Sequence, residues 1–321
     1  MAARSEKPSR DRKKTRAGTI ALVGRPNVGK STLLNTLLGE RIAITSPHPE
    51  TTRDRIAGIL TRDNVQYVFL DTPGLHRARH ELGKRMNEIA ETAATESDVV
   101  VFMTDVAQVP ALKNEDKTLL ALVPANKPTI LVINKVDRVT PKDLLFPVLT
   151  AYSELREFDA VVPLSARRSD SGQARLLEAI GKVLPEGDFL YPDDELSDRP
   201  TRFFVSEFVR EQVLKKTREE IPHGVAVVVE SFEEGDKIIR IAVTIHVAKE
   251  SHKAILIGKG GAMLRSIGTD ARKRTEELLG RKAHLETHVR ATPKWVDDPA
   301  KLKDLGYAEM GAAPKKSKKK H

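Results

Sequence analysis

Residues 24–31 read GRPNVGKS and decide the fold of the first half of this chain. The octapeptide fits the pattern GxxxxGK[ST], follows the apolar run 19–24 (TIALVG) and precedes leucines at helical spacing over 30–39. A glycine-rich turn of this kind lets backbone N–H groups wrap a phosphate chain at the positive end of a helix. The stretch therefore predicts a nucleoside triphosphate site. Its expected phosphate-binding residues are Gly24, Arg25, Pro26, Asn27, Val28, Gly29, Lys30, Ser31 and Thr32.

Apolar runs alternate with helical patterns between residues 18 and 184. The expected strands are 19–24, 65–71, 98–105, 129–134 and 159–164, and the expected helices are 30–39, 84–96, 113–123, 141–155 and 174–184. Such alternation predicts an α/β domain over 18–184, with a doubly wound, mainly parallel sheet covered by helices on both faces.

Residues 185–200 (PEGDFLYPDDELSDRP) end this alternation. Their three prolines, glycine and acidic cluster predict an interdomain linker. A different order, α-β-β-α-α-β, follows over 201–293 and predicts a smaller α+β domain. Its expected helices are 202–219, 251–257 and 261–279, and its expected strands are 225–232, 237–247 and 282–290. Residues 294–321 are expected to form a C-terminal segment with a lysine-rich tail.

Two further segments are expected to complete the phosphate end of the site. Within the loop 24–31, Lys30 is expected to reach the terminal phosphates and Ser31 to bind magnesium. The first further segment is the end of the strand 65–71, where Asp71 is expected to act on the same ion through water. The expected phosphate-binding residues of this strand end and the turn after it are Asp71, Thr72, Pro73, Gly74 and Leu75. The second segment is the polar stretch 48–55, where we expect Thr52 rather than Thr51 to complete the magnesium shell. The alternative is a loop that merely caps a strand.

Asn134-Lys135-Val136-Asp137 begins at the end of an expected strand and predicts the base-binding end. Asp137 can accept two N–H bonds from guanine that adenine cannot supply, so the site would reject adenine by about a factor of 10⁴. Asn134 is expected to bond the base and the phosphate loop, and the Lys135 stem to cover the ring. The backbone at Ser165 and Ala166, after the next strand, is placed to meet the guanine oxygen.

These elements together resemble the translation-factor branch of P-loop GTPases, and the resemblance implies GTP hydrolysis to GDP with Mg²⁺. Many signalling GTPases carry a water-orienting glutamine where this chain has Leu75, which cannot position a water. Slow intrinsic hydrolysis is therefore expected unless another group helps. Asn27 resembles the asparagine with which potassium-activated GTPases hold a cation, so a K⁺ ion at Asn27 is a hypothesis. The alternative is that Asn27 only stabilises its loop.

Residues 258–261 read GKGG and lie between the last two expected helices. With the apolar residues around it and the α-β-β-α-α-β order, this stretch resembles a type II KH domain. That resemblance implies that the loop approaches the backbone of about four nucleotides of single-stranded RNA. The expected RNA-binding residues are Gly258, Lys259, Gly260, Gly261 and Arg265. Ten basic and four acidic side chains over 253–294 agree with a local polyanion site.

From residue 19 to residue 307 the chain resembles the family of Era-like GTPases. The stretches 202–207 (RFFVSE), 218–223 (REEIPH) and Lys294-Trp295 carry the resemblance together with the motifs above. It implies a cytoplasmic factor that binds 16S rRNA near its 3′ end and assists assembly and rRNA processing of the small (30S) ribosomal subunit. It also implies loose peripheral association with the cell membrane. The sequence leaves the oligomeric state open.

Composition sets the outer limits on function. The chain has 321 residues, 40% of them hydrophobic, and no cysteine, which excludes disulfides, a cysteine nucleophile and thiolate metal sites. The net charge of +9 resides in the two tails, because residues 1–17 carry seven basic and two acidic groups and residues 315–320 carry five lysines. We expect 1–17 to be a disordered arm. Each tail either contacts nucleic acid or is simply solvated.

Two other functions remain open. One is a nucleotide-gated protein that docks on membrane or protein partners and uses the KH-like module as a scaffold. The other is a tRNA-modifying enzyme, which would need a further catalytic constellation. His284, Glu286 and His288 do not provide one, because the two histidines would lie about 13 Å apart along a strand.

Overall fold

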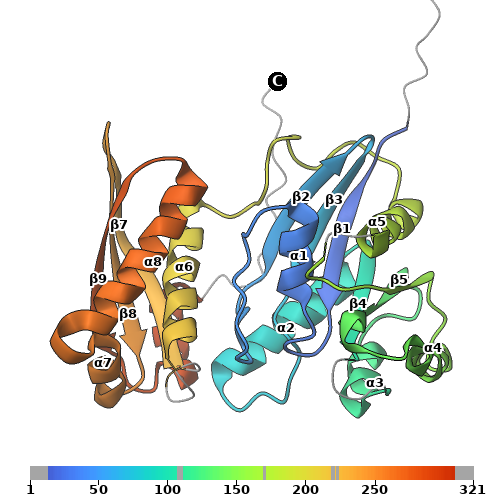
Figure 1. The fold of residues 1–321 in the computed structure, drawn as a ribbon, viewed down its shortest axis with the longest axis horizontal. Helices are drawn as coiled ribbons and strands as arrows, with labels where there is room; N and C mark the ends of the chain where they lie inside the picture. The colour runs from blue at the N-terminus through green and yellow to red at the C-terminus, as the bar shows by residue number, and fades with distance from the viewer. Residues whose placement is uncertain (1–13, 107–110, 169–170, 218–220, 222–223, 308–321) are drawn as a thin grey trace, which may run out of the picture.

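The computed structural model describes residues 14–106, 111–168, 171–217, 221 and 224–307. These residues form a larger α/β unit and a smaller α+β unit that lie side by side (Figure 1). The lysine tail and residues 1–13 of the expected arm lie outside the described residues, as do 218–220 and 222–223. The last two residues of that arm, Arg16 and Ala17, already belong to the first strand.

The larger unit contains a six-stranded sheet in the order β2-β3-β1-β4-β5-β6. Its strands are β1 (Arg16–Val23), β2 (Ile56–Arg62), β3 (Val65–Asp71), β4 (Val99–Asp105), β5 (Thr129–Asn134) and β6 (Ala160–Pro163). Its helices are α1 (Lys30–Leu38), α2 (Glu81–Glu96), α3 (Asn114–Ala121), α4 (Leu145–Ser153) and α5 (Ser171–Val183). All neighbouring strands except β2 and β3 run parallel. Helices α1 and α5 pack on one face and α2, α3 and α4 on the other, which confirms the doubly wound sheet.

Strand β2 is the element of this sheet that the sequence reasoning did not predict. It pairs antiparallel with β3 along its whole length, from Ile56 opposite Asp71 to Arg62 opposite Val65. Only Asp63 and Asn64 connect the two strands, and Asp63 has a φ of 53°. Short polar residues that tolerate a positive φ are typical of two-residue hairpin turns. The dipeptide Asp63-Asn64 between two apolar runs was the sequence signal that could have predicted the β2–β3 hairpin.

The expected linker, residues 185–200, lies along the larger unit. The Ile59 N–H donates to Leu196 O at 2.9 Å, so this segment extends the sheet beyond β2. The Gln66 Oε1 accepts hydrogen bonds from Leu190 N and Tyr191 N at 2.7 and 2.9 Å, and Tyr191 is buried in the core. The segment therefore connects the units as a fixed strap rather than as a free chain.

The smaller unit has a three-stranded sheet in the order β7-β8-β9, with helices packed on one face. Its strands are β7 (Val225–Glu234), β8 (Ile239–Val247) and β9 (Ala283–Ala291), and its helices are α6 (Thr201–Lys216), α7 (Glu250–Ile257) and α8 (Ala262–Leu279). The expected hairpin is β7–β8, and β9 pairs parallel with β8. The apolar residues of α6 and α8 pack on β8. Along the chain the elements follow the order α-β-β-α-α-β that the sequence predicted.

The residues after β9 join the two units. The short helical turns Trp295–Asp297, Pro299–Leu302 and Lys303–Tyr307 bring Trp295 and Leu302 against Leu82 and Met86 of α2. Trp295 is fully buried and stacks on Tyr307 at 5.7 Å between ring centroids. This segment is thus part of the packing between the units. None of the helices in the described ranges has the length and apolarity that a membrane span requires.

Candidate nucleotide and RNA sites

A cavity of about 700 Å³ opens at the carboxyl ends of the parallel strands, where the strand order reverses at β1. Loops after β1, β3, β5 and β6 and the segment between α1 and β2 form its wall. Crevices at such reversal points are the usual ligand sites of open α/β sheets. The predicted residues that line it are Pro26, Asn27, Gly29, Lys30, Ser31, Thr32, Thr52, Gly74, Asn134, Lys135, Asp137, Ser165 and Ala166.

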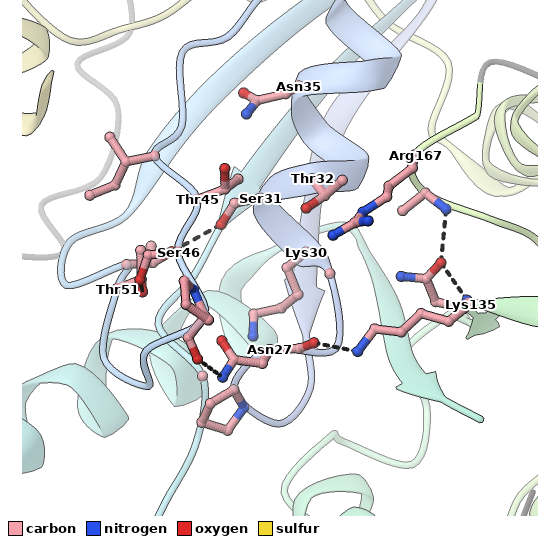
Figure 2. A pocket seen from close by; sticks show the side chains of 18 of the residues that line it. Asn27, Lys30, Ser31, Thr32, Asn35, Thr45, Ser46, Thr51, Lys135 and Arg167 are labelled. Carbon is pink, nitrogen blue, oxygen red and sulfur yellow. Dashed lines mark hydrogen bonds between the residues drawn. The ribbon is translucent and has the colours of Figure 1, made fainter. Parts of the chain in front are cut away.

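The loop between β1 and α1 needs its glycines. Gly24 has a φ of 153° and Gly29 a φ of 108°, a region that side chains rarely allow. A Cβ atom on Gly24 would lie 2.2 Å from Met103 O, and one on Gly29 would lie 2.3 Å from Asn134 Nδ2. The chain therefore turns tightly here and presents the first turn of α1 to the cavity. Figure 2 shows Asn27, Lys30 and Ser31 along this wall.

Lys30 lies over the loop that precedes it. Its ammonium donates to Gly24 O at 3.0 Å and to Arg25 O at 3.1 Å. Burial lowers the pKa of Lys30 to about 8 because the charged form loses solvation, although Asp71 opposes this shift. The Arg25 side chain points elsewhere: its Nε donates to the buried Asp116 of α3 at 2.8 Å. Arg25 thus anchors the back of the loop and does not line the cavity.

Three side-chain oxygens converge beside Lys30. The Ser31 hydroxyl donates to Asp71 Oδ2 at 2.6 Å and lies 3.0 Å from Thr52 Oγ1. Burial raises the pKa of Asp71 to about 6, against the hydrogen bond from Ser31 and the charge of Lys30. Within the described residues Asp71 Oδ1 is buried and has no hydrogen-bond partner. An acidic and two hydroxyl oxygens around one point fit the oxygen ligands that Mg²⁺ requires.

Thr51 does not share this arrangement. Its hydroxyl lies 2.7 Å from Ser46 Oγ and donates to His48 O at 2.6 Å. Figure 2 labels Thr51 and Ser46 on the same side of the cavity. Of the two threonines, the one that approaches Ser31 and Asp71 is therefore Thr52, the residue that the sequence favoured.

The turn after β3 lies against the phosphate loop. A Cβ atom on Gly74 would lie 2.6 Å from Pro26 N, so the Gly74 backbone is in direct contact with that loop. Thr72 donates to Leu22 O at 2.7 Å and, with Pro73, is buried behind the cavity. Leu75 is buried in the core cluster under α2 and α3. Its side chain therefore cannot contact a ligand in the cavity.

Several cavity residues escaped the sequence reasoning, among them Glu50 and Arg167. Glu50 Oε1 lies 3.0 Å from His76 Nε2 and 3.4 Å from His80 Nε2, which joins the segment after α1 to the turn after β3. The hydrogen bond that His76 donates to Glu50 raises the pKa of His76. Figure 2 shows the Arg167 side chain directed toward the cavity between Thr32 and Lys135. Neither residue belongs to a motif with a fixed spacing, so the sequence carried no signal for them.

Asn134 connects the loops of the base end. Its Nδ2 donates to Val28 O at 2.7 Å, and its Oδ1 accepts from the N–H groups of Lys135 and Ala166 at 2.7 and 2.8 Å. Val136 N donates to Leu164 O at 3.4 Å, which holds the same turn. One amide side chain thus positions the phosphate loop, the turn after β5 and the turn after β6.

Lys135 and Asp137 face the cavity from this turn. Lys135 Nζ donates to Asn27 O at 2.8 Å, so its stem crosses toward the phosphate loop (Figure 2). A hydrogen bond from Ser165 lowers the pKa of Asp137, whose side chain is otherwise exposed. Asp137 is consequently an ionised acceptor at neutral pH, free to receive N–H donors.

In the smaller unit, the GKGG turn lies between α7 and α8. Gly258, Gly260 and Gly261 have φ values of 69°, 59° and 77°, and Lys259 and Gly260 are exposed. The Arg265 guanidinium lies beside Gly261, since a Cβ there would be 3.2 Å from Arg265 Nη1. The turn therefore offers exposed backbone flanked by two cationic side chains, which suits a polyanion.

The histidines of β9 form no second centre. Glu286 and His288 are exposed and 3.1 Å apart. In the parts of the chain that the structure covers, no group of three His, Cys, Asp or Glu side chains could hold a metal.

The family described as 50S ribosome-binding GTPase matches residues 19–135, and the KH domain family matches residues 220–295. The chain is 44% identical to GTPase Era of Trichlorobacter lovleyi, over 91% of this chain and 98% of that protein. It is 46% identical to GTPase Era of Geotalea uraniireducens, over 92% and 99%. This chain belongs to the Era family of GTPases. The predicted family resemblance and the predicted GTPase activity are thereby confirmed.

Solved Era structures share the whole architecture. An Aquifex aeolicus Era variant bound to GDP·AlF₄⁻ is 38% identical and superposes with a TM-score of 0.87, over 91% of this chain and 99% of that one. An Era complex with MgGDPNP and nucleotides 1506–1542 of 16S ribosomal RNA matches equally well. The Era fold thus combines a GTPase (G) domain with a KH domain, as the two units here do.

Proposed function

We propose that this chain binds GTP and Mg²⁺ in the described cavity, hydrolyses the GTP, and binds 16S rRNA through its KH domain. The observation that carries the nucleotide part is the Asn134 side chain, which joins the phosphate loop to both turns of the base end. Such a connection makes one continuous site out of separate motifs. The domain limits are proposed as 18–184 for the G domain and 201–293 for the KH domain.

The phosphate end is assigned to the loop 24–31 and the turn at Gly74. Backbone N–H groups and Lys30 would hold the phosphates, while Ser31 and Thr52 would hold Mg²⁺ directly and Asp71 through water. When bound, Mg²⁺ neutralises charge on the triphosphate. Gly74, which already contacts Pro26, is suited to bond the terminal phosphate and to respond to its loss. Since Leu75 is buried, we propose slow intrinsic hydrolysis.

The RNA site is assigned to Gly258–Lys259–Gly260–Gly261 and Arg265. The exposed turn and the basic composition of 253–294 support it, as does the Era complex with a 16S rRNA fragment. We therefore propose a role in small (30S) subunit assembly and rRNA processing, although the description of the family matching 19–135 mentions the 50S ribosome. Sedimentation of the protein with isolated 30S and 50S subunits distinguishes these partners. A cytoplasmic location is proposed from the composition of the sequence, and peripheral membrane contact is proposed from the family resemblance alone.

Calorimetry with GTP and ATP in the presence of Mg²⁺ tests the nucleotide assignment. We expect binding of GTP and no comparable binding of ATP, because Asp137 can satisfy only the N–H groups of guanine. EDTA is expected to weaken the binding of a non-hydrolysable GTP analogue more than that of GDP. Equal heats for GTP and ATP would show that the cavity does not select guanine.

A potassium ion at Asn27 is a separate proposal. The Asn27 Nδ2 donates to Pro47 O at 2.8 Å, which holds the Asn27 amide beside the phosphate loop, where positive charge would assist hydrolysis. We expect hydrolysis to run roughly tenfold faster in KCl than in NaCl at equal ionic strength, and Asn27→Ala to remove this difference. Asn126→Ala, which alters an exposed asparagine outside the cavity, is the control. Equal rates in the two salts for the native chain contradict the proposal.

A further inference from the structure

The KH domain reaches the segment of the G domain that carries Thr52. Helix α6 lies on the side of its unit that faces α1 and the loop after it (Figure 1). Arg210 Nη2 of α6 donates to Thr51 O at 2.5 Å, and Glu211 Oε1 accepts from Thr45 N at 3.3 Å. Both contacts involve backbone atoms of the loop. They therefore depend on the conformation of the loop and not on its side chains.

Arg210 is built into the domain boundary. Its side chain is 1% exposed, and its Nε and Nη2 donate to the two carboxylate oxygens of Glu207 at 2.8 and 2.6 Å. A buried guanidinium needs such a partner, because an unpaired charge in the interior is costly. Glu207 thus fixes the orientation of Arg210, and the remaining bond of Nη2 is directed at Thr51 O.

A group of charged residues around Glu211 supports the contact between α6 and the loop after α1. Glu211 is fully buried and pairs with Arg274 of α8, with Lys215 at 3.2 Å and with Arg41 at 3.7 Å. Arg274 also donates to Arg41 O at 2.7 Å. Residues of α6 and α8 therefore hold both ends of the loop that runs from α1 to Thr52.

The acceptor of Arg210 belongs to the peptide group that leads directly into Thr52. Because this group is planar, fixing the Thr51 carbonyl also fixes the Thr52 nitrogen. On the other side, Arg53 Nη1 donates to Val225 O of β7, and the Arg53 guanidinium lies 5.7 Å from the Trp295 ring centroid. Thr52 is thus held between two contacts to the KH domain and its C-terminal extension.

We propose that Arg210 is a positioning residue of the GTP site, which holds the Thr51–Thr52 peptide so that the Thr52 hydroxyl faces Ser31 and Asp71. The proposal rests on the proposed function of Thr52. It makes the RNA-binding domain a structural part of the triphosphate site. By linkage, a ligand that requires Thr52 in this position favours the docked arrangement of the two domains to the same extent.

The test compares the native chain with Arg210→Met. We expect affinity for a non-hydrolysable GTP analogue with Mg²⁺ to fall about tenfold to a hundredfold, the effect of one charge-assisted hydrogen bond. GDP affinity should change less than about threefold, because GDP binding does not require Thr52. Arg210→Lys should restore part of the loss. Arg202→Met, an exposed arginine on the same helix, is the control.

A second readout needs neither nucleotide nor metal. Amide hydrogen exchange over residues 45–53 is expected to be faster in Arg210→Met than in the native chain and unchanged in Arg202→Met. The variant Arg210→Met with Glu207→Gln removes both charges, so that neither remains unpaired, and should show the same two effects. An analogue-to-GDP affinity ratio and an exchange rate that both match the native chain would overturn the proposal. Failure of the native chain to bind GTP would instead overturn the proposed function.

Discussion

The Asp137→Asn variant is expected to lose affinity for GTP by roughly a hundredfold to ten-thousandfold, which corresponds to two charge-assisted hydrogen bonds of about 1.5–3 kcal/mol each. In the proposed complex the carboxylate would accept from both N–H groups on the edge of guanine, whereas an amide presents one acceptor and one NH₂ group. That NH₂ group would oppose the exocyclic amine of guanine. Xanthine has a carbonyl at this position, so the variant should prefer xanthosine triphosphate.

Competition calorimetry with GTP and xanthosine triphosphate measures this change. Asp143→Asn, which alters an exposed aspartate outside the cavity, should leave both affinities as they are in the native chain. The lowered pKa of Asp137 ensures that the native group is ionised throughout the neutral range. An Asp137→Asn protein that keeps its GTP affinity would mean that another group recognises the base.

The G domain could be predicted because its chemistry depends on residues close together in the sequence. The stretch 24–31 needs glycine where the chain meets Met103 and Asn134, and it has lysine and serine where we propose that phosphates and Mg²⁺ bind. Strand β5 could also be predicted from adjacent residues, because all six of them are buried and its sequence is continuously apolar apart from its ends.

The contacts between the domains could not be predicted in this way. Arg210 and Glu211 are ordinary charged residues of an amphipathic helix until the tertiary structure buries them against Thr51 and Thr45. At Thr51 and Thr45 their partners are backbone atoms, which any residue provides, so no spacing rule reveals these contacts. The prolines and acidic residues of 185–200 predicted a linker, but no spacing rule indicates that Tyr191 packs in the core of the G domain.

Gly260→Asp is expected to weaken binding of an RNA that spans nucleotides 1506–1542 of 16S rRNA by at least about tenfold, while GTP binding stays unchanged. A Cβ atom at Gly260 would meet nothing within 4 Å in the protein, so the added carboxylate projects into the space where the RNA backbone should lie. Its negative charge then faces the phosphates. Fluorescence anisotropy with the labelled fragment measures the loss.

Gly280→Asp separates this effect from backbone strain. Gly280 ends α8 with a φ of 62°, close to the 59° of Gly260, and a Cβ atom there also meets nothing within 4 Å. Both substitutions therefore carry the same cost of a left-handed residue, about 1–2 kcal/mol, and add the same charge to the same domain. Only Gly260 lies in the GKGG turn, so Gly280→Asp should bind the RNA nearly as well as the native chain. Equal RNA affinities for the two variants would indicate that the KH domain is a scaffold and that the RNA binds elsewhere.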